Sequence, residues 1–240
     1  MKAMILAAGQ GSRLRPLTDT CPKPMIPLGG KPLLEHVITL LVKHGFDQLV
    51  VNLHHLPQLI RDYFGDGSAW KVRLTYSPEE ELLGTAGAVR HMSAFFDHPF
   101  LVYYGDNLCN ADLTDFWTTH LRLGGLATMG LHREDDPCRS GIVRLDEGSR
   151  IVQFIEKPRA EQVFPGYLIN AGIYALQPQI FDWIPSLGAS DFSRDIFPRL
   201  LTAGAPIFGH PLRGQLLASD TPERYAEAQT QIASRRFTLP

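Results

Sequence analysis

The 240-residue chain has few cysteines, no long apolar run and no excess of charge of one sign. Its three cysteines are odd in number and widely spaced, which excludes a disulfide framework and a CxxC metal site. No stretch reaches the roughly 18 apolar residues that a membrane-spanning helix requires. The apolar start up to Gly9 is also too short for a signal peptide. The sequence therefore predicts a cytoplasmic protein with no membrane partner.

The 23 basic and 25 acidic side chains leave a net charge of −2. A nearly neutral chain lacks the basic surface that neutralises phosphates along a nucleic acid, so nucleic acid is excluded as a general partner. With 44% hydrophobic residues, 21 glycines and 18 prolines, the composition is that of an ordinary globular chain and not of a disordered one. The length predicts one large domain, residues 1–240.

Strands and helices alternate in the first 110 residues. Short β-branched or aromatic runs predict strands at Met4–Ala8, Gln48–Leu53, Lys71–Tyr76 and Pro99–Tyr104. Apolar residues at helical spacing predict helices at Leu33–Lys43 and after Pro57. This order is typical of a parallel sheet wound with helices.

The rhythm changes after residue 110, where strand-like runs are separated by turn residues. Strands are predicted at Ala127–Leu131, Gly141–Leu145, Ile151–Phe154 and Ala171–Leu176, and helices at Ile180–Ile184, Asp195–Leu201 and Thr221–Ala233. Closely spaced strands favour antiparallel pairing in this half. No repeat and no linker of biased composition divides the chain, which supports a single mixed α/β domain.

A glycine-rich segment, Gly9-Gln10-Gly11, follows the first strand. It does not match a dinucleotide fingerprint, because Leu14 stands where the third glycine is required, and the Gly-Lys-Ser/Thr of a P-loop is absent. Three cations accompany it instead: Arg13, Arg15 and Lys23. Small residues and clustered cations near a strand end suit a triphosphate. A glycine-rich turn without a ligand is the alternative, and Arg15 can equally be a solvated loop residue.

Residues 3–32, AMILAAGQGSRLRPLTDTCPKPMIPLGGKP, resemble the GxGxRLxPLTxxxPKP signature of sugar-1-phosphate nucleotidyltransferases, the nucleotide-sugar pyrophosphorylases. Further motifs occur in the family's order: Leu83-Gly84-Thr85-Ala86-Gly87-Ala88, Gly105-Asp106, Glu156-Lys157-Pro158, Asn170-Ala171-Gly172 and Thr221-Pro222-Glu223. The chain looks most like short mannose-1-phosphate guanylyltransferases. Segment order and resemblance together predict a Rossmann-like three-layer α/β/α domain with a mostly parallel central sheet and a small antiparallel substrate-side elaboration. Residues 1–110 are expected to bind mainly nucleotide, and residues 111–240 mainly sugar phosphate.

The resemblance implies that small residues hold the nucleotide base and that basic residues hold its phosphates. Arg13 matches the arginine that grips the triphosphate, and Lys23 matches the lysine that stabilises charge as pyrophosphate leaves, so both are expected to be catalytic. The implied nucleotide-binding set is Leu6, Ala7, Ala8, Gly9, Gly11, Arg13, Lys23, Gly84 and Gly87. Gly84 and Gly87 also fit a plain turn from a loop into a helix.

The resemblance also implies a sugar-phosphate set, namely Asp106, Gly141, Glu156, Lys157 and Asn170. Lys157 looks like the lysine that holds the sugar phosphate. Glu156 and Asn170 look like the pair that hydrogen-bonds sugar hydroxyls, with the backbone of Gly141 beside them. The alternative for Glu156 and Lys157 is a surface ion pair of little energetic value.

The catalytic ion of the resembled family is Mg²⁺. Asp106 ends a predicted strand and resembles the family's aspartate ligand, although Gly-Asp is also a common turn. The second ligand departs from the family pattern, because Ala218 stands where many relatives carry an aspartate. We expect Asp220, two residues later with the same strand-face parity, to take that role. The alternative is that Asp220 belongs to the N-cap region of the following helix.

The activity implied is attack of a sugar 1-phosphate on the α-phosphorus of a nucleoside triphosphate, which yields a nucleotide-sugar and pyrophosphate. GTP with a mannose-type or heptose 1-phosphate is the expected pair, and uridylyl or cytidylyl transfer stays open. A catalytically weak regulatory subunit that binds nucleotide-sugar also stays open, because Ala218 replaces a metal ligand. The sugar-binding residues disfavour a small non-sugar phosphate as acceptor. A homodimer is compatible with the family.

Overall fold

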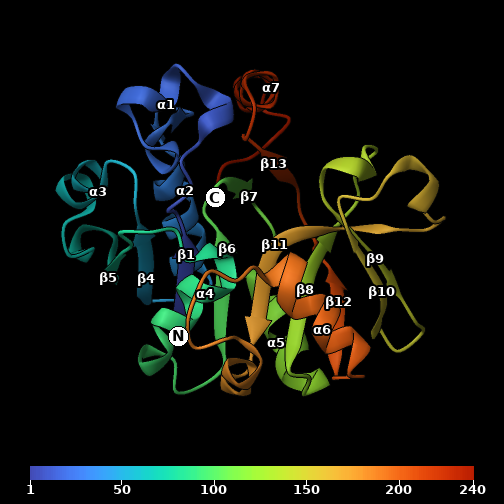
Figure 1. Cartoon of the computed structure of the whole chain (residues 1–240). Coiled ribbons are helices and arrows are strands. Elements are labelled where there is room, and N and C mark those ends of the chain that lie inside the picture. The colour runs from blue at the N-terminus through green and yellow to red at the C-terminus, as the bar shows by residue number, and fades with distance from the viewer. The chain divides into compact units, whose positions relative to one another are not determined.

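The computed structural model describes residues 1–240 and divides into two compact units, each made of segments that are distant in the sequence. The first unit comprises Met1–Leu82, Tyr103–Asp112 and Gly214–Pro240, so it contains both the blue and the red end of the colour scale in Figure 1. The second unit comprises Leu83–Val102 and Leu113–Arg213. The roles expected of residues 1–110 and 111–240 stay predictions.

A parallel sheet forms the centre of the first unit. Strands β1 (Lys2–Leu6), β4 (Gln48–Leu53) and β5 (Arg73–Pro78) follow one another in that order. The last two residues of β6 (Phe100–Tyr104) belong to this unit, where β6 neighbours β1. The bounds predicted for β4 are confirmed. The prediction of a strand at Met4–Ala8 was wrong at both ends, because pairing with β4 starts at Lys2 and the last two residues enter the glycine-rich loop.

Two amphipathic helices of the first unit have the predicted starts. Helix α2 (Leu33–Lys43) buries apolar side chains at helical spacing, and α3 (Pro57–Phe64) begins at its proline and buries Ile60 and Phe64. The shorter elements between β1 and α2 are α1 (Leu17–Thr20) and the pair β2 (Pro27–Leu28) and β3 (Lys31–Pro32). They carry the chain from the glycine-rich loop to α2.

A short antiparallel ribbon joins the middle of the chain to its C-terminal segment. Strand β7 (Asn107–Cys109) pairs with β13 (Leu216–Ala218), and α7 (Pro222–Ala233) follows with Thr221 as its N-cap. The prediction of this helix is confirmed to within one residue. The ribbon was not predicted, because three residues are too few to show an alternating pattern.

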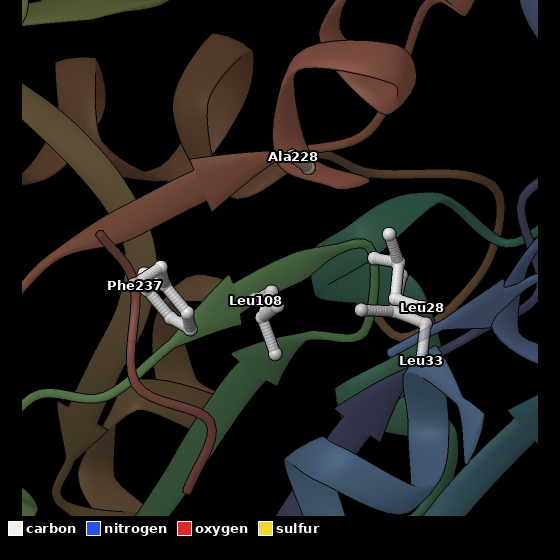
Figure 2. Packing of buried hydrophobic residues seen from close by; sticks show 5 residues of the cluster. All are labelled: Leu28, Leu33, Leu108, Ala228 and Phe237. Atoms are coloured by element: carbon white, nitrogen blue, oxygen red, sulfur yellow. The ribbon is translucent and has the colours of Figure 1, made fainter. Parts of the chain in front are cut away.

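A buried apolar cluster fixes this ribbon in the first unit. Its members come from β2, α2, β7, α7 and the chain end, and they are Leu28, Leu33, Leu108, Ala228 and Phe237. Figure 2 shows Leu108 between Phe237 on one side and Leu28 and Leu33 on the other. Phe237 is only 2% exposed, so this one residue anchors the otherwise largely exposed segment after α7 in the core.

The second unit is built mainly on antiparallel pairs, as its sequence predicted. Strand β8 (Ala127–His132) pairs antiparallel with β11 (Leu168–Leu176) and parallel with β12 (Ile207–Pro211). Strand β9 (Gly141–Leu145) pairs antiparallel with β10 (Ile151–Glu156) and with β11. The first three residues of β6 belong to this unit, where β6 neighbours β11.

The helices of the second unit are α4 (Gly84–His91), α5 (Leu113–Leu123) and α6 (Phe197–Thr202). The predicted helix Asp195–Leu201 is confirmed in part, because a π-helical turn, Phe192–Ile196, leads into α6. The helix predicted at Ile180–Ile184 is a 3-10 helix that starts earlier, at Pro178. No helix in the chain combines the length and the apolar character that crossing a membrane requires.

Truncating Phe237 to alanine should lower the free energy of unfolding by about 3–5 kcal/mol, because it removes a ring from a filled cluster that holds four other elements together. Urea unfolding followed by circular dichroism measures the change. Leu187→Ala is the matched control, since Leu187 is 88% exposed and its truncation should change stability by less than about 0.5 kcal/mol. A loss below about 1 kcal/mol for Phe237→Ala would contradict the anchoring role.

Candidate active site

The glycine-rich loop leaves β1 with two glycines in different situations. Gly9 is exposed, and a side chain built on it would meet nothing within 4 Å, so the backbone there faces open space. Gly11 adopts φ +63°, and a Cβ on it would lie 2.8 Å from Cγ2 of Thr18. Glycine is therefore required at position 11 by backbone conformation and packing, whereas at position 9 it leaves the backbone open to a ligand.

Lys23 and Asp106 form a short ion pair in the first unit. The Lys23 Nζ to Asp106 Oδ2 distance is 2.7 Å, and the lysine side chain is only 10% exposed. Asp106 follows Gly105, whose N–H donates to the carbonyl oxygen of Leu6 at 2.9 Å. A Cβ on Gly105 would lie 2.9 Å from Cγ2 of Ile5, so glycine permits this close approach. The strand end thus places Asp106 beside the start of the glycine-rich loop.

Asp220 is held between two arginines. Its carboxylate pairs with Arg13 Nη1 at 2.6 Å and with Arg224 Nη1 at 3.3 Å, and its side chain is 17% exposed. Burial raises the pKa of Asp220, but the positive charges of Arg13, Lys23 and Arg224 outweigh burial and hold that pKa below its usual value. The N-cap of α7 is Thr221, whose Oγ1 accepts the N–H of Arg224. The side chain of Asp220 is therefore engaged by cations and makes no cap.

The ribbon brings the two aspartates to the same place. Ala218 pairs with Asn107, and the Ser219 hydroxyl donates to the backbone oxygen of Asp106 at 3.2 Å. Asp106 therefore precedes β7 and Asp220 follows β13 at the same end of the ribbon. Lys23, which pairs with Asp106, also acts electrostatically on Asp220. Four residues predicted from the sequence are thus gathered in one cluster, here called the ion-pair cluster: Arg13, Lys23, Asp106 and Asp220.

Two carboxylates are a suitable donor set for Mg²⁺. This ion prefers hard oxygen ligands and commonly takes only one or two carboxylates, with substrate phosphates completing its shell. No group of three or more His, Cys, Asp or Glu residues in the chain forms a self-sufficient metal site. Asp106 and Asp220 therefore fit an ion that arrives with a phosphate. Arg15 stands apart, since it pairs with Asp19 on the surface.

Gly84, in the second unit, is required by the packing of the chain itself, whereas a Cβ on Gly87 would have its nearest neighbours at 3.3 Å. Gly84 opens α4 at φ +72°, and a Cβ on it would overlap the carbonyl oxygen of Ser190. That same oxygen accepts the N–H groups of Ala86 and Gly87 at 2.9 and 3.1 Å. The Gly87 N–H is therefore engaged within the chain, and the nucleotide-binding role of both glycines stays a prediction.

Hydrogen bonds of Thr85 and Asp191 join the start of α4 to the π-helical turn, and neither residue was predicted from the sequence to have this role. The Thr85 hydroxyl donates to Asp191 Oδ2 at 3.0 Å and accepts the N–H of Phe192 at 2.9 Å. Asp191 also accepts the N–H groups of Ser193 and Arg194. An aspartate just before a helical pattern is a common N-cap signal, so this role was open to prediction.

Gly141 and Glu156 are cross-strand partners in β9 and β10. A Cβ on Gly141 would lie 2.8 Å from Glu156 Oε2, so glycine makes room for the carboxylate. Burial raises the pKa of Glu156, with Lys157 opposing and Asp191 reinforcing that rise. Glu156 is therefore a half-buried carboxylate that is partly deprived of water.

Lys157 and Asn170 complete the predicted sugar-phosphate residues of the second unit. Lys157 adopts φ +47°, a strained value for a side-chain-bearing residue, and its N–H donates to the Ser140 oxygen at 3.2 Å. The Asn170 amide donates to the Tyr174 hydroxyl at 2.9 Å and to Ser193 Oγ at 3.4 Å. Ser193 is also a hydrogen-bond partner of the Glu156 carboxylate. Gly141, Glu156, Lys157 and Asn170 are thus linked through neighbouring residues.

Comparison with known proteins shows the family to which this sequence belongs. A family profile described as nucleotidyl transferase matches residues 2–225. The chain is 40% identical over 222 residues to a UTP–glucose-1-phosphate uridylyltransferase of Synechocystis sp., covering 87% of this chain and 57% of that protein. It is 33% identical over 232 residues to a mannose-1-phosphate guanylyltransferase of Mycobacterium tuberculosis, covering 96% of this chain and 64% of that protein. The chain therefore spans less than two thirds of these relatives.

A solved structure extends the likeness to the fold. HddC from Yersinia pseudotuberculosis, complexed with GMP-PN, superposes with a TM-score of 0.80 at 25% identity, covering 96% of this chain and 99% of that one. The resemblance drawn from the motifs and the predicted Rossmann-like α/β fold are both confirmed.

Replacing Glu156 with glutamine should raise the melting temperature at neutral pH. A raised pKa means that the fold favours the protonated acid, so the stability that protonation confers is present below the unfolded-state pKa and is lost as pH rises through the folded-state pKa. Glutamine stays neutral throughout. Glu156→Gln should therefore melt roughly 1–3 °C higher than the parent at pH 8, with the difference vanishing near pH 4.

Differential scanning calorimetry across this pH range measures the effect of Glu156→Gln. Glu161→Gln is the matched control, because Glu161 is an exposed glutamate of the same unit and its replacement should shift the melting temperature equally little at every pH. A difference that is the same at pH 4.5 and pH 8 would show that ionisation of Glu156 is not the cause.

Proposed function

Because the chain belongs to the nucleotidyl transferase family, we propose that it transfers the nucleotidyl group of a nucleoside triphosphate to a sugar 1-phosphate. The products are a nucleotide-sugar and pyrophosphate. The ion-pair cluster beside the glycine-rich loop is the observation that carries the proposal. It combines cations for a triphosphate with two carboxylates for a divalent metal, which is what phosphoryl-group chemistry requires.

The reaction needs no protein nucleophile. An oxygen of the sugar phosphate attacks the α-phosphorus, a new P–O bond forms, and the bond to the leaving pyrophosphate breaks. A phosphate monoester is already anionic at neutral pH, so catalysis consists of alignment and charge neutralisation. Arg13, whose side chain is 64% exposed, is free to follow the phosphates, whereas the largely buried Lys23 offers a fixed charge. Mg²⁺, held by Asp106 and Asp220, would supply further charge neutralisation when bound.

When substrate binds, the cations and the carboxylates of the ion-pair cluster would each exchange their present partner for a group of the substrate. Without nucleotide, each aspartate neutralises a cation at 2.6 or 2.7 Å. A triphosphate offers the cations new anionic partners, and its divalent ion offers the carboxylates a new cation. Each cation and each carboxylate of the cluster therefore has a partner of opposite charge before and after binding.

The second unit supplies the residues for the sugar phosphate in this proposal. Lys157 provides the positive charge, and Glu156 and Asn170 provide acceptors and donors for hydroxyl groups.

GTP with a mannose-type 1-phosphate is the substrate pair we favour, and UTP with glucose 1-phosphate is the second candidate. The guanylyltransferase from Mycobacterium tuberculosis and the guanine-nucleotide complex of HddC support the first pair. The 40% identity to the uridylyltransferase of Synechocystis sp. supports the second. The location in the cytoplasm and the homodimer stay predictions.

Pyrophosphate release from a matrix of four nucleoside triphosphates against mannose, glucose and heptose 1-phosphates, with Mg²⁺, tests the function. The GTP and mannose 1-phosphate pair should turn over fastest, and Lys23→Ala should lower kcat by about 10²–10³-fold, because it removes the largely buried cation to which the proposal assigns the charge of the leaving pyrophosphate. Lys71→Ala, at an exposed turn, is the control and should leave kcat unchanged. No release from any pair, with nucleotide-sugar still bound, would favour the regulatory alternative.

Replacing Asp220 with asparagine should raise the Mg²⁺ concentration for half-maximal activity and lower kcat by about tenfold or more, because one of two carboxylates is lost. Glu227→Gln, an exposed carboxylate of α7, is the matched control. Adding Ala218→Asp to Asp220→Asn should restore Mg²⁺ dependence in part, since position 218 lies opposite Asn107 in the same ribbon. Unchanged Mg²⁺ titration curves for Asp220→Asn would rule out its metal role.

A further inference from the structure

Hydrogen bonds between polar groups link the C-terminal ends of β1, β4 and β5 at the start of the glycine-rich loop. Asn52 is 4% exposed and Glu79 is 7% exposed, and both lie among apolar strand residues of the first unit. Asn52 Oδ1 accepts the N–H of Ala7 at 2.6 Å, and Asn52 Nδ2 donates to Glu79 Oε1 at 2.8 Å. Neither residue belongs to the nucleotide-binding set implied by the motifs. Their hydrogen bonds nevertheless end on that loop.

The orientation of the Asn52 amide is fixed by both neighbours. If the amide were flipped, its NH₂ would face the N–H of Ala7 and its oxygen would face the carboxylate of Glu79, so both hydrogen bonds would become repulsive contacts. The carboxylate polarises the amide and strengthens its oxygen as an acceptor. The position of the Ala7 peptide is thus set by a chain of two hydrogen bonds that has one possible arrangement.

Glu79 is itself held at the backbone. Its N–H donates to the Leu53 oxygen at 2.8 Å, and its carbonyl oxygen lies 2.9 Å from Nδ1 of His54. The carboxylate therefore starts from a fixed main chain just after β5. The main chain of β4 and β5 therefore holds Glu79, Glu79 holds the side chain of Asn52, and Asn52 holds the N–H of Ala7 at the start of the loop.

We infer that Asn52 and Glu79 are positioning residues that hold the glycine-rich loop in its nucleotide-binding conformation. The Ala7 N–H is held by Asn52 two residues before Gly9, where a side chain would meet open space. A loop fixed before binding loses less conformational entropy when the nucleotide arrives, so this network sets nucleotide affinity. The inference rests on the proposed function, because it assumes that the loop binds a nucleoside triphosphate.

Three variants test the network by reversing its polarity. Asn52→Asp keeps an acceptor for Ala7 but places two carboxylates face to face, so the dissociation constant for GTP should rise roughly 10- to 100-fold. Glu79→Gln keeps an acceptor for Asn52 and should change it by less than about fivefold. In the double variant Asn52→Asp/Glu79→Gln, the introduced glutamine amide can donate to the introduced aspartate, which still accepts the N–H of Ala7. Affinity should therefore return to within about fivefold of the parent.

Calorimetric titration of the full chain with GTP, and separately with UTP, gives these dissociation constants without sugar phosphate. Steady-state kinetics should show a raised KM for the triphosphate in Asn52→Asp and an unchanged KM for the sugar 1-phosphate. Ser77→Ala is the matched control, because Ser77 pairs with Asn52 across β4 and β5, is buried, and makes no side-chain hydrogen bond. It should leave the dissociation constant unchanged.

The outcomes separate this inference from the proposed function. If the parent protein binds neither GTP nor UTP, the proposed function fails. If the parent binds and Asn52→Asp binds equally well, or if the double variant regains its melting temperature but not its affinity, the positioning role is overturned. If Asn52→Asp does not fold, the double variant decides alone, because restored folding with parental affinity is expected and restored folding without it contradicts the inference.

Discussion

The pairing of β7 with β13 is the constraint on which the ion-pair cluster depends. Asp106 and Asp220 are more than a hundred residues apart, and only the register that sets Ala218 opposite Asn107 brings them to one end of the ribbon. A ribbon of three residues per strand is too short to be stable alone. It persists because Leu108, from its centre, packs with Phe237 and Ala228 from the chain end. The packing of Leu108 in the core therefore helps to fix the positions of Asp106 and Asp220.

Elements with strong local signals could be predicted from the sequence. The residues of α2 show helical periodicity, those of β4 form a continuous apolar run, and α7 begins with a Thr-Pro-Glu start signal, so their bounds match closely. The ion pairs within the cluster could not be predicted, because they depend on the register of two strands that carry no pattern of their own. Asn52 was not singled out, because it is a lone polar residue within an otherwise apolar run, Leu49–Leu53, that predicts a buried strand.

The fold itself accounts for some of the motif glycines and not for others. The motif that contains Gly84 and Gly87 suggests backbone contacts to a ligand, yet the Ser190 carbonyl oxygen explains the glycine at position 84 by packing and already accepts the N–H of Gly87. Gly141 likewise makes room for the Glu156 carboxylate. Gly9 is the contrasting case, because nothing in the chain requires glycine there. A side chain that is absent without a structural reason is a better pointer to a ligand than one whose absence the fold explains.

The internal neutrality of the ion-pair cluster has a consequence for selectivity among anions. An entering anion must displace carboxylates that are tethered to the protein and already lie at contact distance from Arg13 and Lys23. A small anion such as inorganic phosphate can replace the carboxylates as partners of Arg13 and Lys23, but it leaves Asp106 without its lysine and Asp220 with Arg224 alone. A polyphosphate that carries its own divalent cation replaces both sets of partners at once. In the proposed reaction, the two aspartates therefore favour a metal-bound triphosphate over a simple anion.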